Sequence, residues 1–223
     1  GLTSITDAQA ESLSKVNWLR LNGLISITDP QAESLSKVDF LTISEACREQ
    51  IKLYQQKIVD KINFSGNITD EQAKSLSTVE ELSLNGLTSI TDEQAEILSK
   101  VETLFLNGLT SINEKQSEFF SRVNILYLNG LTSITDEQLE FLGQVEHLSL
   151  KDLTSITDKQ AEILSRNSKL ELNGLPSITD KQAEILSKVR YLELNGLPSI
   201  TDKQAEILSK VQAELTLNGL TLI

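Results

Sequence analysis

Few residues in this 223-residue chain could carry catalysis or bind a metal ion. The sequence contains one cysteine, Cys47, and one histidine, His147. They belong to sequence repeats that lie five repeats apart, so parallel strands about 4.8 Å apart would separate them by roughly 24 Å, too far for a nucleophilic dyad. A zinc site needs more Cys and His ligands, and no glycine-rich phosphate-binding loop of the GxGxxG or GxxxxGK type occurs. The sequence therefore predicts that the protein is not an enzyme and that it needs no cofactor or metal.

A column of recurring aspartates is the other group that could bind a cation. Each precedes a predicted helix, and a carboxylate is stabilised there by the positive end of the helix dipole, which favours a structural role over calcium binding. The column comprises Asp7, Asp29, Asp70, Asp92, Asp136, Asp158, Asp180 and Asp202. Cys47 lies on the apolar side of its predicted helix, which is typical of a buried small hydrophobe rather than a reactive thiol.

Composition excludes several classes of partner. The chain has 20 Lys and Arg against 32 Asp and Glu, a net charge of −12. This charge disfavours nucleic acid and anionic membrane surfaces as partners. Apolar residues make up 39% of the chain, as in a folded protein, but no apolar run approaches the roughly 18 residues that a membrane span requires. We expect neither nucleic-acid binding nor membrane insertion.

These residues are positioned by a repeat of about 22 residues. Residues 170–189 (LELNGLPSITDKQAEILSKV) recur unchanged at 192–211, and ten looser copies of the segment VxxLxL cover the chain. The LxL core alternates as a short strand does. Gly108 ends one strand where a positive φ is predicted. Thr91 and Gln94 then predict a capping box, followed by a helix of roughly ten residues with Ala95, Leu98 and Val101 on its apolar side.

The consensus VxxLxLNGLxSITDxQAxxL resembles the leucine-rich-repeat family, specifically its cysteine-containing, ribonuclease-inhibitor-like class. Leu131, Ile134, Thr135 and Asp136 match that pattern, although leucine replaces the cysteine and the period is only 22 residues. The resemblance implies an α/β fold: a right-handed leucine-rich-repeat solenoid with a concave parallel sheet and short convex helices. We expect a single domain over residues 1–223 with about ten repeats, truncated in mid-repeat at both ends. Members of this family most often bind proteins.

The third unit, residues 44–66, is irregular. Cys47, Ile51, Tyr54 and Ile58 are spaced as one face of a longer helix that Ser44 would cap. The unit is either a degenerate repeat that ends in a strand containing Asn63, or an interruption that changes the curvature and offers a separate contact surface. Asn63 and Asn67 both begin glycosylation triplets, which chance also produces in such repeats.

The columns of the strands that face away from the core carry the variable residues. Five of the ten aromatic residues fall there: Trp18, Phe40, Phe105, Tyr127 and Tyr191. Phe105, Ile125, Tyr127 and His147, with Thr103 beside them, are predicted to form a contiguous patch that binds a protein. Cross-strand pairing that only stiffens the sheet is the alternative. Trp18 with Phe40 forms a second candidate.

Other columns have predicted structural roles. A run of asparagines is expected to join neighbouring repeats through hydrogen bonds. Glu171, Glu193 and Glu214 predict an acidic surface that suits a basic partner. Ile97, Phe119, Phe141, Ile163, Ile185 and Ile207 are expected to pack between convex helices, although an exposed stripe could instead support self-association.

The sequence therefore predicts a non-catalytic scaffold that binds a protein ligand through its concave sheet. The alternative is a structural or adhesive spacer of a secreted or cell-surface bacterial protein, with glycan binding as one form of adhesion. A secreted or cell-surface location is favoured over a cytoplasmic one. Repeats without caps would also allow copies to associate end to end.

Overall fold

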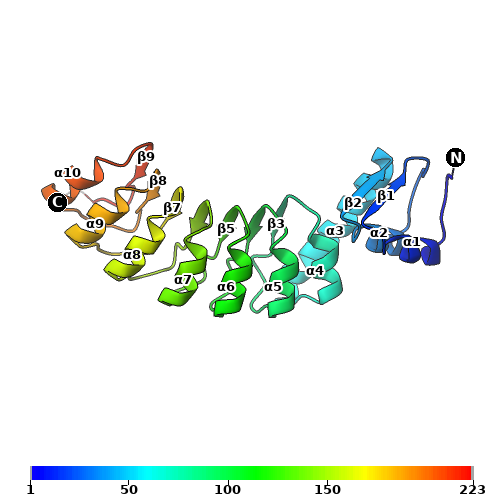
Figure 1. Cartoon of the computed structure of the whole chain (residues 1–223), viewed down its shortest axis with the longest axis horizontal. Helices are drawn as coiled ribbons and strands as arrows, with labels where there is room; N and C mark the ends of the chain where they lie inside the picture. The colour runs from blue at the N-terminus through cyan, green and yellow to red at the C-terminus, as the bar shows by residue number, and fades with distance from the viewer. Residues whose placement is uncertain (1, 222–223) are drawn as a thin grey trace.

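The computed structural model describes residues 2–221 as an arc of alternating strands and helices (Figure 1). The strands line the concave side and the short helices the convex side. The short helices are α1 (Asp7–Leu13), α2 (Asp29–Leu35), α4 (Asp70–Leu76), α5 (Asp92–Leu98), α6 (Glu114–Phe120), α7 (Asp136–Leu142), α8 (Asp158–Leu164), α9 (Asp180–Leu186) and α10 (Asp202–Leu208). One helix is long, α3 (Glu45–Ser65).

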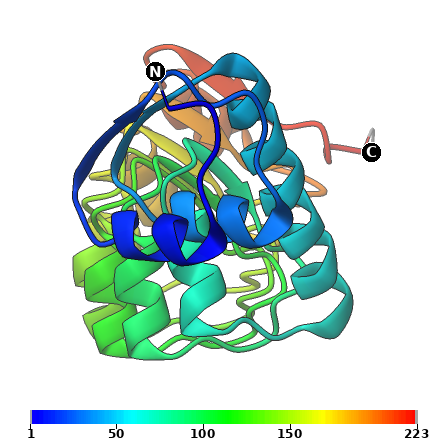
Figure 2. The same cartoon turned by 90° about the vertical axis from the view of Figure 1, so that its right-hand side faces the viewer.

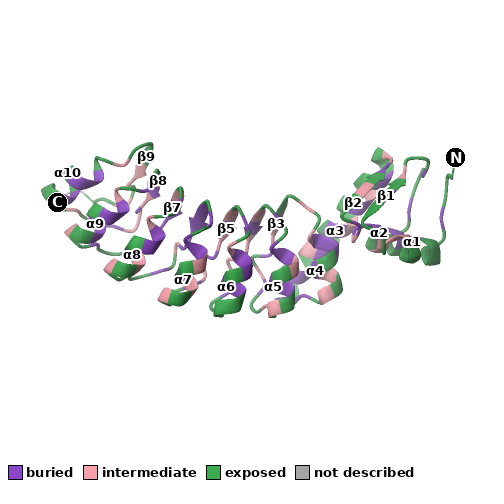
Figure 3. Ribbon diagram, in the orientation of Figure 1, coloured by how far each residue is buried: buried purple, intermediate pink, exposed green. Residues whose placement is uncertain are grey.

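The strands form two parallel sheets. The first contains β1 (Trp18–Leu21) and β2 (Phe40–Ile43). The second contains β3 (Glu81–Ser83), β4 (Thr103–Phe105), β5 (Ile125–Tyr127), β6 (His147–Ser149), β7 (Lys169–Glu171), β8 (Tyr191–Glu193) and β9 (Glu214–Thr216), in sequence order. Leu82, Leu104 and Leu126 are aligned in register, so the repeat period sets the pairing. These three leucines are buried. Figure 3 shows buried residues on the strands and on the short helices.

The predicted capping boxes are confirmed. Thr91 accepts a hydrogen bond from the backbone of Gln94, whose side chain accepts one from the backbone of Thr91. The same box begins all nine short helices in the described residues. The helices have seven residues instead of the predicted ten or so. Val101 lies beyond the helix end, where its amide donates to the carbonyl of Leu98 and its side chain is buried.

The glutamine of the capping box also joins successive repeats, a role that the repeat pattern alone does not reveal. Gln94 donates through Nε2 to the carbonyl of Ile68 at 3.0 Å, and Gln116 donates to that of Ile90 at 2.8 Å. Each glutamine thus satisfies a helix N-terminus and a loop carbonyl of the preceding repeat. Such coupling is needed because one repeat cannot bury its apolar face alone.

The repeat glycines serve close approach, and the predicted positive φ is wrong. Gly66 is the only residue with a positive φ in the described chain, and it caps α3. A Cβ at Gly108 would collide with the carbonyl oxygens of Asn85 and Leu87. Glycine therefore suits this turn, because the turn of one repeat lies directly against the backbone of the preceding one; Asp152 takes the position in one repeat.

Residues 44–66 interrupt the solenoid and do not form a repeat. The strand predicted around Asn63 is absent because α3 continues to Ser65, so the described chain has nine strands instead of ten and His147 lies on the sixth. Figure 2 shows α3 running along one flank of the solenoid. The side-chain amide of Asn63 donates to the carbonyl of Ser83, and its Oδ1 accepts from the backbone amide of Gly86, so this side chain joins α3 to the β3 repeat.

Helix α3 connects two hydrophobic cores. Cys47 and Ile51 pack in the N-terminal core, Ile58 and Ile62 pack in the larger one, and Tyr54 contacts both. The apolar face predicted for this helix is therefore confirmed, and Cys47 is fully buried. Ser44 precedes the helix, but its hydroxyl donates to the carbonyl of Leu24 instead of capping α3. No helix in residues 2–221 is both long and apolar enough to cross a membrane.

Candidate protein-binding surface

The structure brings Phe105, Tyr127 and His147 together on the concave face, and we call these three residues the central aromatic group. Strand register aligns Phe105 with Tyr127, and their rings stack with centroids 4.2 Å apart and an angle of 6° between their planes. The ring of His147 meets Tyr127 edge to face at 5.1 Å. Phe105 and Tyr127 are half-buried, as are the neighbouring Thr103 and Ile125. The predicted patch is thus contiguous, but much of its ring surface faces other rings.

His147 itself is buried, with only 8% of the residue exposed. Its Nε2 lies 2.8 Å from Oε1 of Glu171, whose side chain is 4% exposed. Ser149 donates to Glu171 Oε2 at 2.8 Å, and the ammonium groups of Lys151 and Lys169 lie 2.9 and 3.2 Å from that carboxylate. We call these five residues the Glu171 network. His147 contributes to this network and to the edge of Tyr127, and offers little surface to a partner.

Within the Glu171 network, one buried carboxylate is held by two ammonium groups and by His147 and Ser149. Burial by itself raises the pKa of Glu171, but hydrogen bonds from His147, Lys151 and Ser149 outweigh it and hold that pKa well below its usual range. Burial, together with the nearby Glu171 carboxylate, raises the pKa of Tyr127, so its phenol is neutral at physiological pH. Glu171 therefore contributes less to an acidic surface than the sequence predicts, whereas Glu214 is exposed.

Trp18 and Phe40 form a second stacked pair on the two-stranded sheet. Their ring centroids are 4.1 Å apart, with 16° between the planes. Trp18 is 69% exposed and Phe40 53% exposed, so this pair offers more aromatic surface than the central aromatic group. The pair borders a hollow of about 670 Å³ that Arg20, Asp39 and Thr42 also line.

Tyr191 is separate from both pairs. It lies on β8, aligned through Lys169 with His147 two strands away. Its ring is half-buried and lies beneath the guanidinium of Arg190, which is 5.3 Å from the ring centroid. The five outward aromatic residues thus form two stacked pairs and one isolated ring.

The asparagine column has the structural role predicted for it. Asn85 Oδ1 accepts from the backbone amide of Asn107 at 3.2 Å, and Asn107 Oδ1 accepts from that of Asn129 at 3.1 Å. Asn129 continues the pattern to the amide of Lys151 and also accepts from Ser149. These asparagines hold one rim of the concave face in register.

Of the six convex residues predicted to pack between helices, Phe119, Ile163, Ile185 and Ile207 are buried, whereas Ile97 and Phe141 are half-buried. Aspartates at the helix starts form ion pairs with lysines of the following repeat. Lys181 Nζ lies 3.0 Å from Asp158, and Lys203 Nζ lies 2.9 Å from Asp180. Within residues 2–221, no group of three or more His, Cys, Asp or Glu side chains is arranged to hold a metal ion.

The decisive feature for the fold is the repeated unit itself. Each unit adds one strand in register to a parallel sheet, turns at a closely packed glycine or its equivalent, and returns through a capped convex helix. The chain folds as a parallel α/β solenoid with the architecture of leucine-rich repeats. Its leucines fill the interior, and its outward strand residues are free to vary.

Comparisons with known proteins find no matching family model and no matching curated sequence. Among solved structures, internalin C2 of Listeria monocytogenes is similar over 95% of this chain and 84% of its own, with 19% identity and a TM-score of 0.49. Internalin F of the same organism is similar over 98% and 77%, with 15% identity and a TM-score of 0.45. A chain of the Drosophila Toll–Spatzle complex is similar over 82% of this chain, with 11% identity and a TM-score of 0.49. This chain spans only 23% of the length of that one.

Proposed function

We propose that this leucine-rich-repeat solenoid is a non-catalytic scaffold that binds a protein through its concave sheet. The observation that carries the proposal is the pair of aromatic stacks on that face, Phe105 with Tyr127 and Trp18 with Phe40. The leucines complete the core without them. Stacked aromatic side chains on a rigid surface bury apolar area at low cost in conformational entropy, as residues that dominate binding energy commonly do.

The two stacks have different roles in this proposal. Phe105, Ile125 and Tyr127 form the centre of the contact, and the Glu171 network fixes the orientation of Tyr127 through His147. Trp18 and Phe40 extend the contact toward the amino end, and their greater exposure gives a partner more surface to cover. Tyr191 and the exposed carboxylate of Glu214 lie toward the other end, where a basic partner surface would be favoured.

Affinity capture from the organism that produces the protein tests the proposal. The wild type is compared with Phe105→Ala/Tyr127→Ala and with Trp18→Ala/Phe40→Ala, and captured proteins are quantified by mass spectrometry. Phe141→Ala is the matched control, because this half-buried aromatic residue lies on convex helix α7. We expect one protein to be captured by the wild type and by the control but lost from the Phe105/Tyr127 variant. Equal capture by all variants would contradict recognition through the concave aromatics.

A structural or adhesive spacer remains the second candidate, and one observation favours it. The last repeats share both sequence and contacts: Gln182 and Gln204 donate to the preceding repeat at the same distance of 2.8 Å. Uniform units of this kind add length without adding specificity. Glycan-array binding that is insensitive to the Phe105/Tyr127 substitutions, together with a secreted or cell-surface location, would support this candidate.

A further inference from the structure

The break between β2 and β3 leaves two strand edges without a strand partner in the described chain. β2 is paired only with β1, and β3 only with β4. On the convex side the solenoid remains closed, since Ser36 Oγ lies 2.6 Å from Ser75 Oγ and Lys37 Nζ lies 2.8 Å from Glu71. The interruption by α3 therefore separates the strands while the helices on either side of it stay in contact.

The free edge of β2 presents a defined set of backbone groups. The amide of Phe40 donates to the carbonyl of Asn17, so Phe40 directs its backbone polar groups toward β1. Backbone groups alternate along a parallel strand, so those of Leu41 and Ile43 point toward the break. An unpaired edge of this kind is a template for an added strand.

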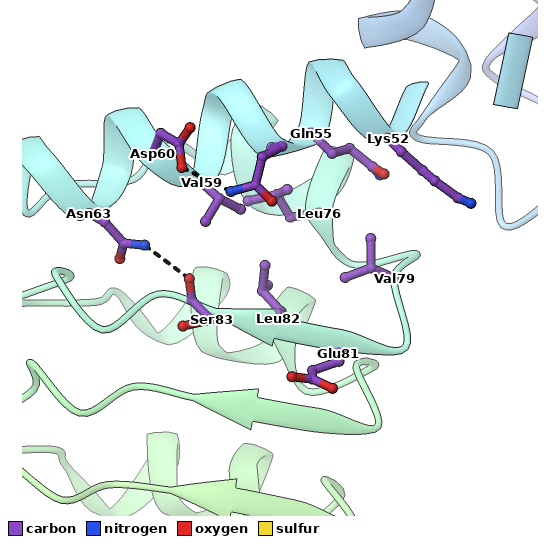
Figure 4. A pocket seen from close by; sticks show the side chains of 11 residues that line it. Lys52, Gln55, Val59, Asp60, Asn63, Leu76, Val79, Glu81, Leu82 and Ser83 are labelled. Carbon is purple, nitrogen blue, oxygen red and sulfur yellow. Dashed lines mark hydrogen bonds between the residues drawn. The ribbon is translucent and has the colours of Figure 1, made fainter. Parts of the chain in front are cut away.

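The break contains a groove that would receive such a strand. A hollow of about 560 Å³ is lined by Leu41 and Ile43 of β2, by Ile51 and Gln55 of α3, and by Val79 before β3, among others. A second hollow of about 430 Å³ follows α3 along β3 and shares Gln55 and Val79 with the first (Figure 4). The groove therefore has a mixed lining in which apolar side chains of β2 and α3 lie among polar ones, and one wall is an open strand edge.

The far end of this groove is closed on the β3 side. The side-chain amide of Asn63 donates to the carbonyl of Ser83 at 3.1 Å, as Figure 4 shows. The edge of β3 is therefore partly satisfied by α3, whereas β2 has no comparable cover. An added strand would pair with β2, turn its other backbone edge toward β3, and direct its side chains alternately to the groove floor and to the concave face.

Charge identifies the chemistry of the occupant. Asp39, Glu80 and Glu81 line the groove, are exposed, and form no ion pair within residues 2–221. The two basic residues of the lining are already engaged on α3, Arg48 with Glu45 and Lys52 with Glu49. The free charge at the groove is therefore negative, which complements Lys or Arg side chains.

We propose that this break is a docking slot for an extended, basic peptide segment of a partner protein. The segment adds as a strand to the free edge of β2, places alternate apolar side chains on the groove floor, and pairs its basic side chains with Glu80 and Glu81. The slot is distinct from the central aromatic group and does not depend on it, but it adjoins the Trp18–Phe40 pair, because Asp39 lines both hollows.

The test uses a fluorescein-labelled peptide of sequence KVKVKVK and the full chain, with binding measured by fluorescence anisotropy. We expect Glu80→Gln/Glu81→Gln to weaken binding about fivefold. Glu93→Gln/Glu96→Gln on convex helix α5 has the same net charge and should leave affinity unchanged, as should Phe105→Ala/Tyr127→Ala. An equal loss in the Glu93/Glu96 variant would show general charge attraction and overturn the proposal.

Strand addition itself is tested with two peptides that carry N-methyl groups on alternate residues, either all the lysines or all the valines. Since alternate amides of a strand point to opposite edges, only one of the two peptides should lose affinity. Hydrogen exchange should slow at the amides of Leu41 and Ile43 when the unmethylated peptide binds. Equal affinity of both methylated peptides, or protection of these amides by self-association of the free chain, would overturn the proposal.

Discussion

Substitution of Glu171 by glutamine should destabilise the solenoid by about 2 to 3 kcal/mol at pH 7. Each oxygen of the wild-type carboxylate accepts from two groups: Oε1 lies near His147 Nε2 and Lys169 Nζ, and Oε2 lies near Ser149 and Lys151. Glutamine retains one oxygen and replaces the other with an amide that donates. Two of the four partner groups would then face the amide of the new glutamine, which is itself a donor. The wild-type side chain at this site is only 4% exposed, so water cannot readily compensate.

The magnitude follows from the exposure of the partners. Breaking a fully buried ion pair costs about 3 to 5 kcal/mol. The side chains of Lys151 and Lys169 are 41% and 37% exposed, so they can recover part of their hydration and the cost is lower. Glu193→Gln is the matched control, because Glu193 is aligned with Glu171 on the next strand. Its carboxylate is 24% exposed and lies 3.8 Å from Lys169, so its loss should cost less than about 1 kcal/mol.

The effect should also depend on pH. The folded-state pKa of Glu171 lies below its value in the unfolded chain, which is about 4.3. A lowered folded-state pKa contributes stability that is fully present above the unfolded value and is lost as pH falls below it. The difference in unfolding free energy between the wild type and Glu171→Gln should therefore narrow as the pH falls from about 5 toward 2.

Urea unfolding followed by far-ultraviolet circular dichroism measures these differences at pH 7 and at pH 3. The wild type, Glu171→Gln and Glu193→Gln are compared at both values, with the slope checked for a change in cooperativity. An equal loss of stability in the two variants would refute the reasoning, because it would mean that burial and the four hydrogen-bonding partners do not distinguish Glu171. A difference that stays constant between the two pH values would refute the ionic origin of the effect.

Three further predictions concern the repeat and the long helix. Gly108→Ala should lower the free energy of unfolding by about 2 kcal/mol or more, because its Cβ would collide with two carbonyl oxygens, whereas Thr110→Ala at an exposed position of the same turn should have little effect in urea unfolding. Gln116→Ala should cost about 1 to 3 kcal/mol, because it removes hydrogen bonds to the carbonyl of Ile90 and the amide of Asn113. An effect no larger than that of Glu118→Ala on the same helix would contradict this prediction. Burial, with a contribution from Glu33, raises the pKa of Tyr54 to about 12, so ultraviolet titration should show a late tyrosinate transition that Tyr54→Phe removes.

Much of the candidate binding surface could be predicted from the sequence. Strand alternation and a constant period place Phe105 beside Tyr127 whenever successive strands pair in register, and their stacking confirms that placement. The exposure of those rings could not be predicted in the same way. It depends on how much surface neighbouring rings cover, so Trp18 and Phe40 proved more exposed than the central aromatic group. The link from His147 to Glu171 runs diagonally between the adjacent strands β6 and β7, and periodicity alone does not reveal it.

The sequence by itself determined the unit of this protein, because the capping box, the LxL strand and the turn are each specified by residues close together in the chain. Thr91 and Gln94 start a helix wherever their repeat is placed. Only the tertiary structure decided whether residues 44–66 form one more repeat or an interruption. The apolar face of residues 44–66 could be buried in either arrangement. The choice depends on the cores against which it packs, and Ile51 packs in the N-terminal core whereas Ile58 packs in the larger one. The same long-range packing explains the glycine at this turn, since both carbonyl oxygens that a Cβ at Gly108 would meet, those of Asn85 and Leu87, belong to the preceding repeat.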